Sequence, residues 1–191
     1  MVSSMEAVGK LKRIVAQAPS LLMAISPEKA SNQPAPGKWS KKQELGHLVD
    51  SACNNHQRVV RAQVEEQPAL PDYDGDRWVA LHNYQVMDWS EIIECWRVMN
   101  QQLIRAAMLV APRASGRKLT VGGHPMTLSV LVNDYVDHLR HDLRHIGIDL
   151  GPEDRRSRRS AESPCKNNPR AVIPPSGADT ISITNPGQTT R

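Results

Sequence analysis

The chain has 191 residues, of which 39% are hydrophobic and 23% charged, and this composition fits a globular protein with one core. The formal net charge is +4, but residues 1–150 contain 17 Lys/Arg against 16 Asp/Glu, while residues 151–191 contain 7 against 4. A nearly neutral body argues against a basic groove for nucleic acid.

The cysteines and the apolar runs bear on the compartment. Cys53, Cys95 and Cys165 have no CxxC spacing and leave one thiol over, which argues against a disulfide framework or a structural zinc site. We expect Cys53 and Cys95 to be buried small hydrophobes. The start of the chain lacks a signal-type apolar run, and no stretch approaches the roughly 20 apolar residues of a membrane span. A cytoplasmic protein without a membrane partner is therefore expected.

The first half of the chain predicts two helices. Apolar residues at spacings of three and four over residues 5–17 indicate a helix that ends before Pro19. Ser40 and Gln43 form a capping-box pattern at the start of a second periodic run, which predicts a helix over residues 41–63.

Two more helices follow in the second half. Asp88 and Glu91 form another capping-box pattern before an apolar run that reaches Met108, and Pro112 closes this segment. Thr127 is placed to cap a last helix that ends near Gly147 or Gly151. No strand-like alternation of useful length competes with these segments, so an all-α four-helix bundle is expected.

Two segments do not fit the helical pattern. The connection over residues 64–87 is too long for a plain bundle turn, and long ordered loops in compact domains are usually functional. Residues 152–191 are basic and Pro-containing, with no periodic apolar face, and we interpret them as a disordered tail. The expected domain therefore spans residues 1–151.

Three of the seven histidines, His138, His141 and His145, lie within eight residues beside Asp142. The 138/142 pair and the 141/145 pair are each spaced i, i+4, so either pair could present two metal ligands on one helix face. On a helical wheel the apolar residues of this segment define the core side, and Asp142 and His138 border it most closely. The 138/142 pair is therefore favoured for a site that faces inward.

The second helix carries a polar stripe opposite its apolar one. The stripe consists of His47, Asp50, Ser51, Asn54 and Arg58. On spacing alone, a solvated face is the favoured interpretation.

Several motifs together resemble the DinB-like superfamily. They are WSKKQELGHLVDS over residues 39–51, WRVMN over 96–100, TL at 127–128 and DYVDHLRH over 134–141. Their order and spacing are kept over most of residues 5–148. The similarity is greatest to the branch that contains metal-dependent hydrolases and thiol transferases.

The resemblance implies a four-helix bundle whose metal is held by one His on helix two and two His four apart on helix four. By motif, His47 matches the first ligand and His138 the second, while the third position is occupied by Asp142. A carboxylate is a legitimate ligand, so His47, His138 and Asp142 form the favoured set for Zn, Ni, Mn or Fe. Two alternatives stay open: His141 or His145 supplies the third nitrogen, or the site has decayed.

Function follows from the resemblance as an expectation. A metal-dependent hydrolase or thiol (S-)transferase would use the ion to activate a water or a thiol, with Asp50 supporting His47 or positioning a small-molecule substrate. A low-molecular-weight thiol is one candidate substrate, and a homodimer is an open option. The rival hypothesis is a non-catalytic four-helix-bundle interaction protein with a degenerate metal site. The string His141-Asp-Leu-Arg-His145 is only a weak match to the zinc-protease motif HExxH.

Overall fold

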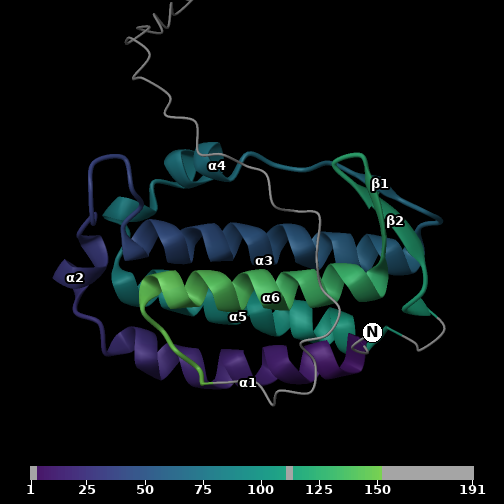
Figure 1. Cartoon of the computed structure of the whole chain (residues 1–191), viewed down its shortest axis with the longest axis horizontal. Coiled ribbons are helices and arrows are strands. Elements are labelled where there is room, and N and C mark those ends of the chain that lie inside the picture. The colour runs from purple at the N-terminus through teal and green to yellow at the C-terminus, as the bar shows by residue number, and fades with distance from the viewer. Residues whose placement is uncertain (1–3, 111–113, 152–191) are drawn as a thin grey trace, which may run out of the picture. The chain divides into compact units, whose positions relative to one another are not determined.

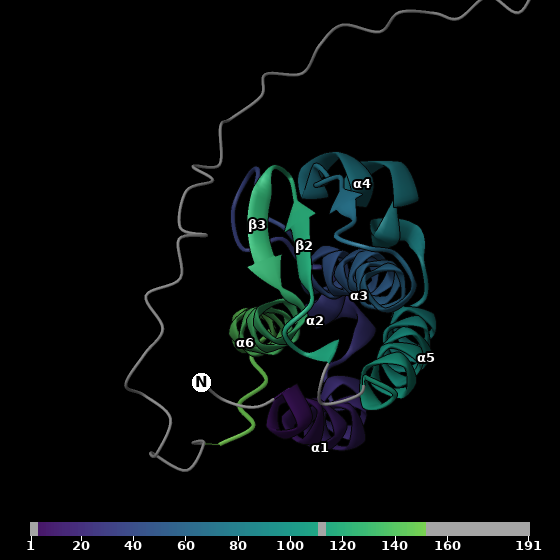
Figure 2. The same ribbon diagram turned by 90° about the vertical axis from the view of Figure 1, so that its right-hand side faces the viewer.

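Four long helices form a bundle in a computed structural model that describes residues 4–110 and 114–151. They are α1 (Ser4–Met23), α3 (Lys41–Val64), α5 (Trp89–Met108) and α6 (Leu128–Ile146). In cross-section α1 neighbours α5, α5 neighbours α3, α3 neighbours α6, and α6 neighbours α1 (Figure 2). The expected all-α bundle is confirmed, and the expected tail over residues 152–191 lies outside the described residues.

The ends of the helices follow local chemistry. Ser40 and Gln43 form a complete capping box at the start of α3, and the Thr127 side chain accepts from the Val130 N–H at the start of α6. Gly147 ends α6 with φ of 98°, in the left-handed region that glycine enters without a Cβ clash. Asp88 does occupy the N-cap of α5, but its side chain makes no capping hydrogen bond there.

The predicted end of the first helix is wrong, because α1 continues through Pro19 to Met23. Proline removes one helical hydrogen bond, and tertiary packing offsets that loss here. Ala18 and Leu22 are fully buried on either side of Pro19. The indole N–H of Trp89 also donates to the Leu22 carbonyl over 2.9 Å, which ties the last turn of α1 to α5.

A small three-stranded sheet is the element that the sequence pattern missed. It consists of β1 (Ala69–Leu70), β2 (Lys118–Val121) and β3 (His124–Thr127), with β1 parallel and β3 antiparallel to β2. Strands of two to four residues are too short for a recognisable alternation. The turn between β2 and β3 consists of Gly122 and Gly123, both at positive φ, which is the backbone of a tight hairpin.

The long connection between α3 and α5 crosses over the bundle. It contains β1, the short helix α4 (Gly75–His82) and a 3₁₀ turn η1 (Tyr84–Val86). A further short helix, α2 (Pro27–Ser31), lies between α1 and α3. Figure 1 shows it returning along α3 from the β1 end toward the other end of the bundle. Its length has a structural reason, since α3 has 24 residues and spans about 36 Å at 1.5 Å per residue.

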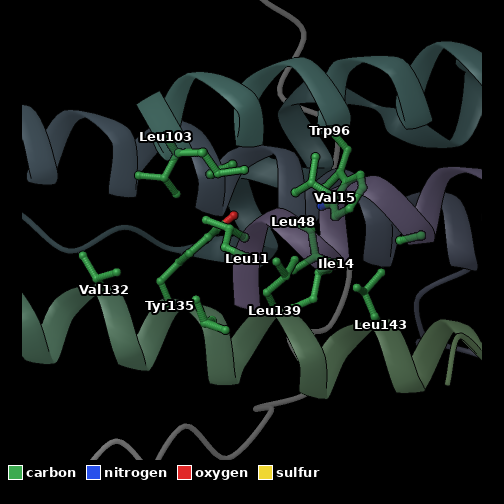
Figure 3. Close-up of a cluster of buried hydrophobic side chains, with 14 of the residues drawn as sticks. Leu11, Ile14, Val15, Leu48, Trp96, Leu103, Val132, Tyr135, Leu139 and Leu143 are labelled. Carbon is green, nitrogen blue, oxygen red and sulfur yellow. The ribbon is translucent and has the colours of Figure 1, made fainter. Parts of the chain in front are cut away.

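The core lies among the four helices and is built from the predicted apolar faces (Figure 3). Trp96, Leu48 and Leu139 are fully buried, and the buried Tyr135 hydroxyl donates to Asn100. The expectation for the cysteines is wrong, because Cys95 is exposed and Cys53 is only partly buried. Both lie on helix flanks, where the core faces of α3 and α5 have already turned away.

Candidate metal centre between two helices

The candidate site lies between α3 and α6, which run side by side in both views (Figures 1 and 2). His47 is in the second turn of α3, so the capping box at Ser40 fixes where it projects. His138 and Asp142 are one turn apart on α6. One imidazole from α3 therefore meets an imidazole and a carboxylate from α6.

The three side chains converge on one oxygen. His138 Nε2 lies 2.9 Å and His47 Nε2 lies 3.9 Å from Asp142 Oδ2. The two imidazole rings are 5.4 Å apart between centroids, with an angle of 67° between their planes. We call His47, His138 and Asp142 the inner group; one potential ligand atom from each lies within 4.8 Å of the other two.

The two histidines of the inner group favour the ionised form of Asp142. Burial alone would raise the pKa of Asp142, but the hydrogen bond and charge of His138, followed by the charge of His47, lower it below the usual range. Burial likewise works against a charged His138, yet the bond to Asp142 raises the pKa of this imidazole. The side chain of Asp142 is 10% exposed and that of His138 is 43% exposed, so the group is open on the His138 side.

Aromatic rings and a glycine cover His47. The Trp39 ring lies 5.3 Å and the Tyr73 ring 6.3 Å from its imidazole, measured between centroids. A Cβ on Gly75, at the start of α4, would lie 3.1 Å from His47 Cε1. The absence of a side chain at Gly75 therefore lets α4 close directly over this imidazole.

A second carboxylate on α3 contacts the same covering segment. Asp50 is 2% exposed, and its Oδ1 accepts from the Tyr84 hydroxyl over 2.7 Å and lies 2.9 Å from His82 Nδ1. We call these three residues the Asp50 group. Burial raises the pKa of Asp50 above its ordinary value, although Tyr84 and then His82 work in the opposite direction. Burial and the neighbouring Asp50 also raise the pKa of Tyr84.

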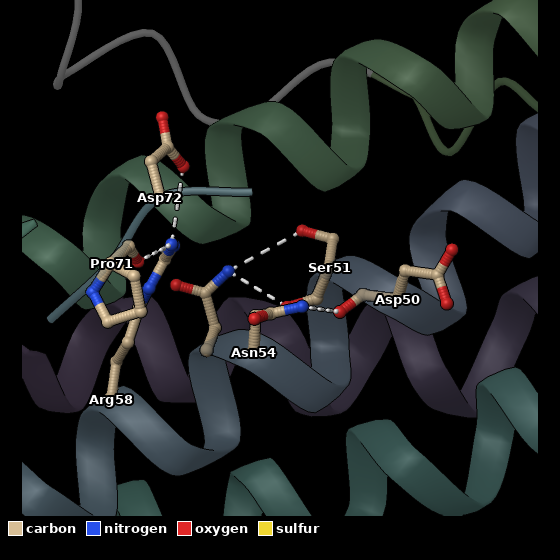
Figure 4. A network of polar contacts seen from close by, with 7 residues as sticks. Asp50, Ser51, Asn54, Arg58, Pro71 and Asp72 are labelled. Atoms are coloured by element: carbon tan, nitrogen blue, oxygen red, sulfur yellow. Dashed lines mark hydrogen bonds and ion pairs between the residues drawn. The ribbon is translucent and has the colours of Figure 1, made fainter. Parts of the chain in front are cut away.

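The solvated interpretation of the polar stripe on α3 is wrong. Asp50 and Ser51 are 2% exposed and Arg58 is 9% exposed, because residues 71–84 and α6 cover this face. Figure 4 shows how the stripe is satisfied: Arg58 donates to the Pro71 carbonyl over 3.1 Å and contacts Asp72. The amides of Asn54 and Asn55 donate to backbone carbonyls one turn earlier on the same helix.

The other histidines of α6 also gather around Asp142. His141 and His145 are exposed, their rings lie 4.4 Å apart, and together with Asp142 they form a second group with ligand-like spacing. The sequence reasoning missed Trp39, Tyr73, His82 and Tyr84 as neighbours of the site. The unusual length of the 64–87 connection was the signal that could have identified three of them.

The fold and the site define a class of protein: helical bundles with a candidate metal centre between two helices. Similarity to known proteins identifies the family. The model of the DinB superfamily matches residues 10–146, so the chain belongs to the DinB superfamily. In the part of the chain that the structure describes, no helix is both long and apolar enough to cross a membrane.

Two bacterial proteins illustrate the similarity. A Bacillus licheniformis protein named as a candidate metal-dependent hydrolase is 27% identical over 150 residues, which cover 73% of this chain and 80% of that protein. YfiT of Bacillus subtilis, named in the same way, is 25% identical over 115 residues, which cover 58% of this chain and 63% of YfiT.

A solved structure supports the fold independently. The structure of YfiT, described as having an unusual four-helix bundle topology, matches with a TM-score of 0.68 at 20% identity. The match covers 75% of this chain and 83% of that chain. At this identity the likeness establishes the shared bundle.

Proposed function

We propose that this protein is a metal-dependent hydrolase of the DinB superfamily, with a divalent ion held by His47, His138 and Asp142. The observation that carries the proposal is the convergence of two imidazole nitrogens and one buried carboxylate within 4.8 Å. The names of the Bacillus relatives, which describe candidate metal-dependent hydrolases, point to the same reaction class.

The donor set fits a divalent cation. Two ligand atoms about 2.1 Å from an ion, at the angles of tetrahedral or octahedral sites, are separated by about 3.0 to 3.4 Å. The distances to Asp142 Oδ2 are 2.9 Å from His138 and 3.9 Å from His47, so small side-chain adjustments reach that spacing. Two His and one carboxylate suit Zn, Ni, Mn and Fe(II), and this set does not choose among them.

The surroundings of the inner group fit hydrolysis. A bound divalent ion supplies acidity to a coordinated water, which makes a nucleophile available near neutral pH. Asp142 is prepared as an anionic ligand because its pKa is lowered. Trp39 and Tyr73 shield His47 from solvent on one side, while the half-exposed His138 side leaves the group open to solvent and to a diffusing small molecule.

Asp50 has a supporting role in this proposal. Its contacts with His82 and Tyr84 fasten the end of α4 and η1 onto α3. The start of the same α4 packs on the His47 imidazole at Gly75. Asp50 thus contributes to the site by holding the covering segment, and through it the orientation of His47.

Metal analysis of protein purified without a His-tag tests the proposal. We expect stoichiometric Zn, Ni, Mn or Fe in the full chain, and loss of the ion held by the inner group in His47→Ala and His138→Ala. His124→Ala, which changes an exposed histidine of β3, is the matched control and should retain the metal. Hydrolysis of a chromogenic ester panel by the metal-loaded chain should fall in the same two variants.

Two results would contradict the proposal. If His47→Ala and His138→Ala each hold as much metal as the full chain, the inner group is not the site. If the ion is bound but no hydrolysis depends on it, the chain is a metallated interaction module instead of an enzyme.

A further inference from the structure

The outer face of α6 carries a second set of potential ligands. His141, Asp142 and His145 each offer one ligand atom, and these atoms lie within 4.8 Å of one another. The rings of His141 and His145 are 4.4 Å apart between centroids, in an edge-on arrangement. We call these three residues the outer group. It is not needed by the proposed reaction, which uses the inner group.

The helix itself arranges the two imidazoles of the outer group. Residues four apart on an α-helix are neighbours on one face, so a rigid helix presents two nitrogens with little further loss of side-chain freedom. Both histidines are exposed, which leaves coordination positions open to water or to a ligand.

The electrostatic environment also favours a cation there. α6 ends at Ile146, so His141 and His145 lie in its last two turns, close to the negative end of the helix dipole. Asp142 adds a carboxylate to the two imidazoles at ligand-like spacing. An imidazole pair with one carboxylate suits Zn, Ni and Cu better than Mg or Ca.

Asp142 belongs to both groups, and its two oxygens allow it to serve both. The contacts within the inner group, from His47 and from His138, are made to Oδ2. A carboxylate can bind one ion through each oxygen, and carboxylates bridge neighbouring ions in hydrolytic two-metal sites. The side chain that completes the inner group can thus also anchor an ion on the outer face.

We propose that the outer group, His141 and His145 with the shared carboxylate of Asp142, binds a second divalent transition-metal ion at the same time as the inner group holds the first. The simultaneous binding of two ions rests on the proposed function for the inner ion, whereas the outer ion depends on His141 and His145. The second ion makes α6 the shared wall of a two-metal site bridged by Asp142.

Zinc titration of the metal-free, tag-free full chain tests this proposal by isothermal calorimetry and equilibrium dialysis. We expect two zinc ions per wild-type chain. The double variant His141→Ala/His145→Ala should bind one, and the double variant His47→Ala/His138→Ala should also bind one. His124→Ala, at an exposed histidine outside both groups, should bind two and controls for non-specific surface binding.

The outcomes separate the two proposals. One ion in the wild type that is lost only in His141→Ala/His145→Ala supports the outer site and overturns the proposed inner site. One ion that is insensitive to His141→Ala/His145→Ala overturns the outer site alone. One ion that is lost in either double variant also overturns the second site, because a single ion then draws on both groups. Circular dichroism of each variant confirms that it is folded.

Discussion

Asp142 and Asp50 are both nearly buried carboxylates beside histidines, yet their pKa values shift in opposite directions. Burial raises the pKa of each, but two imidazoles, first His138 and then His47, outweigh that effect at Asp142 and lower its pKa. At Asp50 one imidazole and the Tyr84 hydroxyl are not sufficient, and the pKa is raised. The partners available to a buried carboxylate thus decide whether it stays ready as an anionic ligand or serves to fasten the fold.

This contrast is sharpest in metal binding. Asp142→Asn removes the shared anionic ligand, so we expect the affinity for zinc to fall by more than the roughly 100-fold that loss of a supporting residue can cause. Asp50→Asn should lower it by about 10-fold or less, because Asp50 acts on His47 only through the covering segment. Zinc-induced shifts of the melting temperature measure both. Equal losses of zinc affinity in the two variants would contradict the assignment of Asp142 as a ligand and of Asp50 as a residue that only holds the covering segment.

Two glycines give the next largest effect, which is on the free energy of unfolding. Gly46 packs against Tyr84 of the Asp50 group, and Gly75 packs against His47 of the inner group. A Cβ on Gly46 would lie 2.1 to 2.7 Å from ring carbons of Tyr84, which is 5% exposed. Gly46→Ala should therefore lower the free energy of unfolding by about 3 kcal/mol, at the upper end of overpacking effects. A Cβ on Gly75 would lie 3.1 Å from the His47 ring. Gly75→Ala should cost about 1 kcal/mol or less.

Urea unfolding of the metal-free chain measures this difference, with zinc binding as a second readout. Gly75→Ala should disturb zinc binding more than stability, because it displaces the His47 imidazole. If Gly46→Ala is as stable as the wild type, the Tyr84 ring does not pack on Gly46 as described. The Asp50 group then does not hold the covering segment rigidly on α3.

Removing one hydroxyl tests the Asp50 group more gently. Tyr84→Phe keeps the ring over Gly46 but removes the donor to Asp50, so we expect a loss of about 2 kcal/mol, typical of a buried hydrogen bond to a charged group. The zinc-induced shift should be nearly unchanged. A large loss of zinc affinity with little loss of stability would instead place Tyr84 in the chemistry of the inner group.

The smallest expected effect is a pH dependence that belongs to Asp50. A raised pKa means that the folded chain binds this proton more tightly than the unfolded chain does. The stabilisation is complete below the ordinary Asp pKa and is lost as pH rises through the raised value. As the pH rises from the ordinary Asp pKa through the raised value, Asp50→Asn should therefore gain stability relative to the wild type. Asp149→Asn, at an exposed carboxylate, is the control, and an identical pH trend in both variants would contradict the assignment.

The helices of the bundle were predictable because their signals are local. Periodic apolar residues and the caps at Ser40 and Thr127 located α3 and α6 to within a residue or two, and the wheel of α6 correctly turned Asp142 toward the interior. The same local rules ended α1 too early at Pro19, since they contain no term for the packing of Leu22 against the bundle. They also passed over the strands, which are too short to show a period.

The sequence by itself determined which side chains share a helix face: His138 with Asp142, His141 with His145, and the polar stripe that begins at His47. Only the tertiary structure decided what those faces meet. The crossover of residues 65–88 buried the stripe that looked solvated, and it brought His82 and Tyr84 to Asp50 from more than thirty residues away. The physical reason is that periodicity reports direction around one helix axis, whereas burial, pKa shifts and ligand spacing depend on distances between helices that no local pattern encodes.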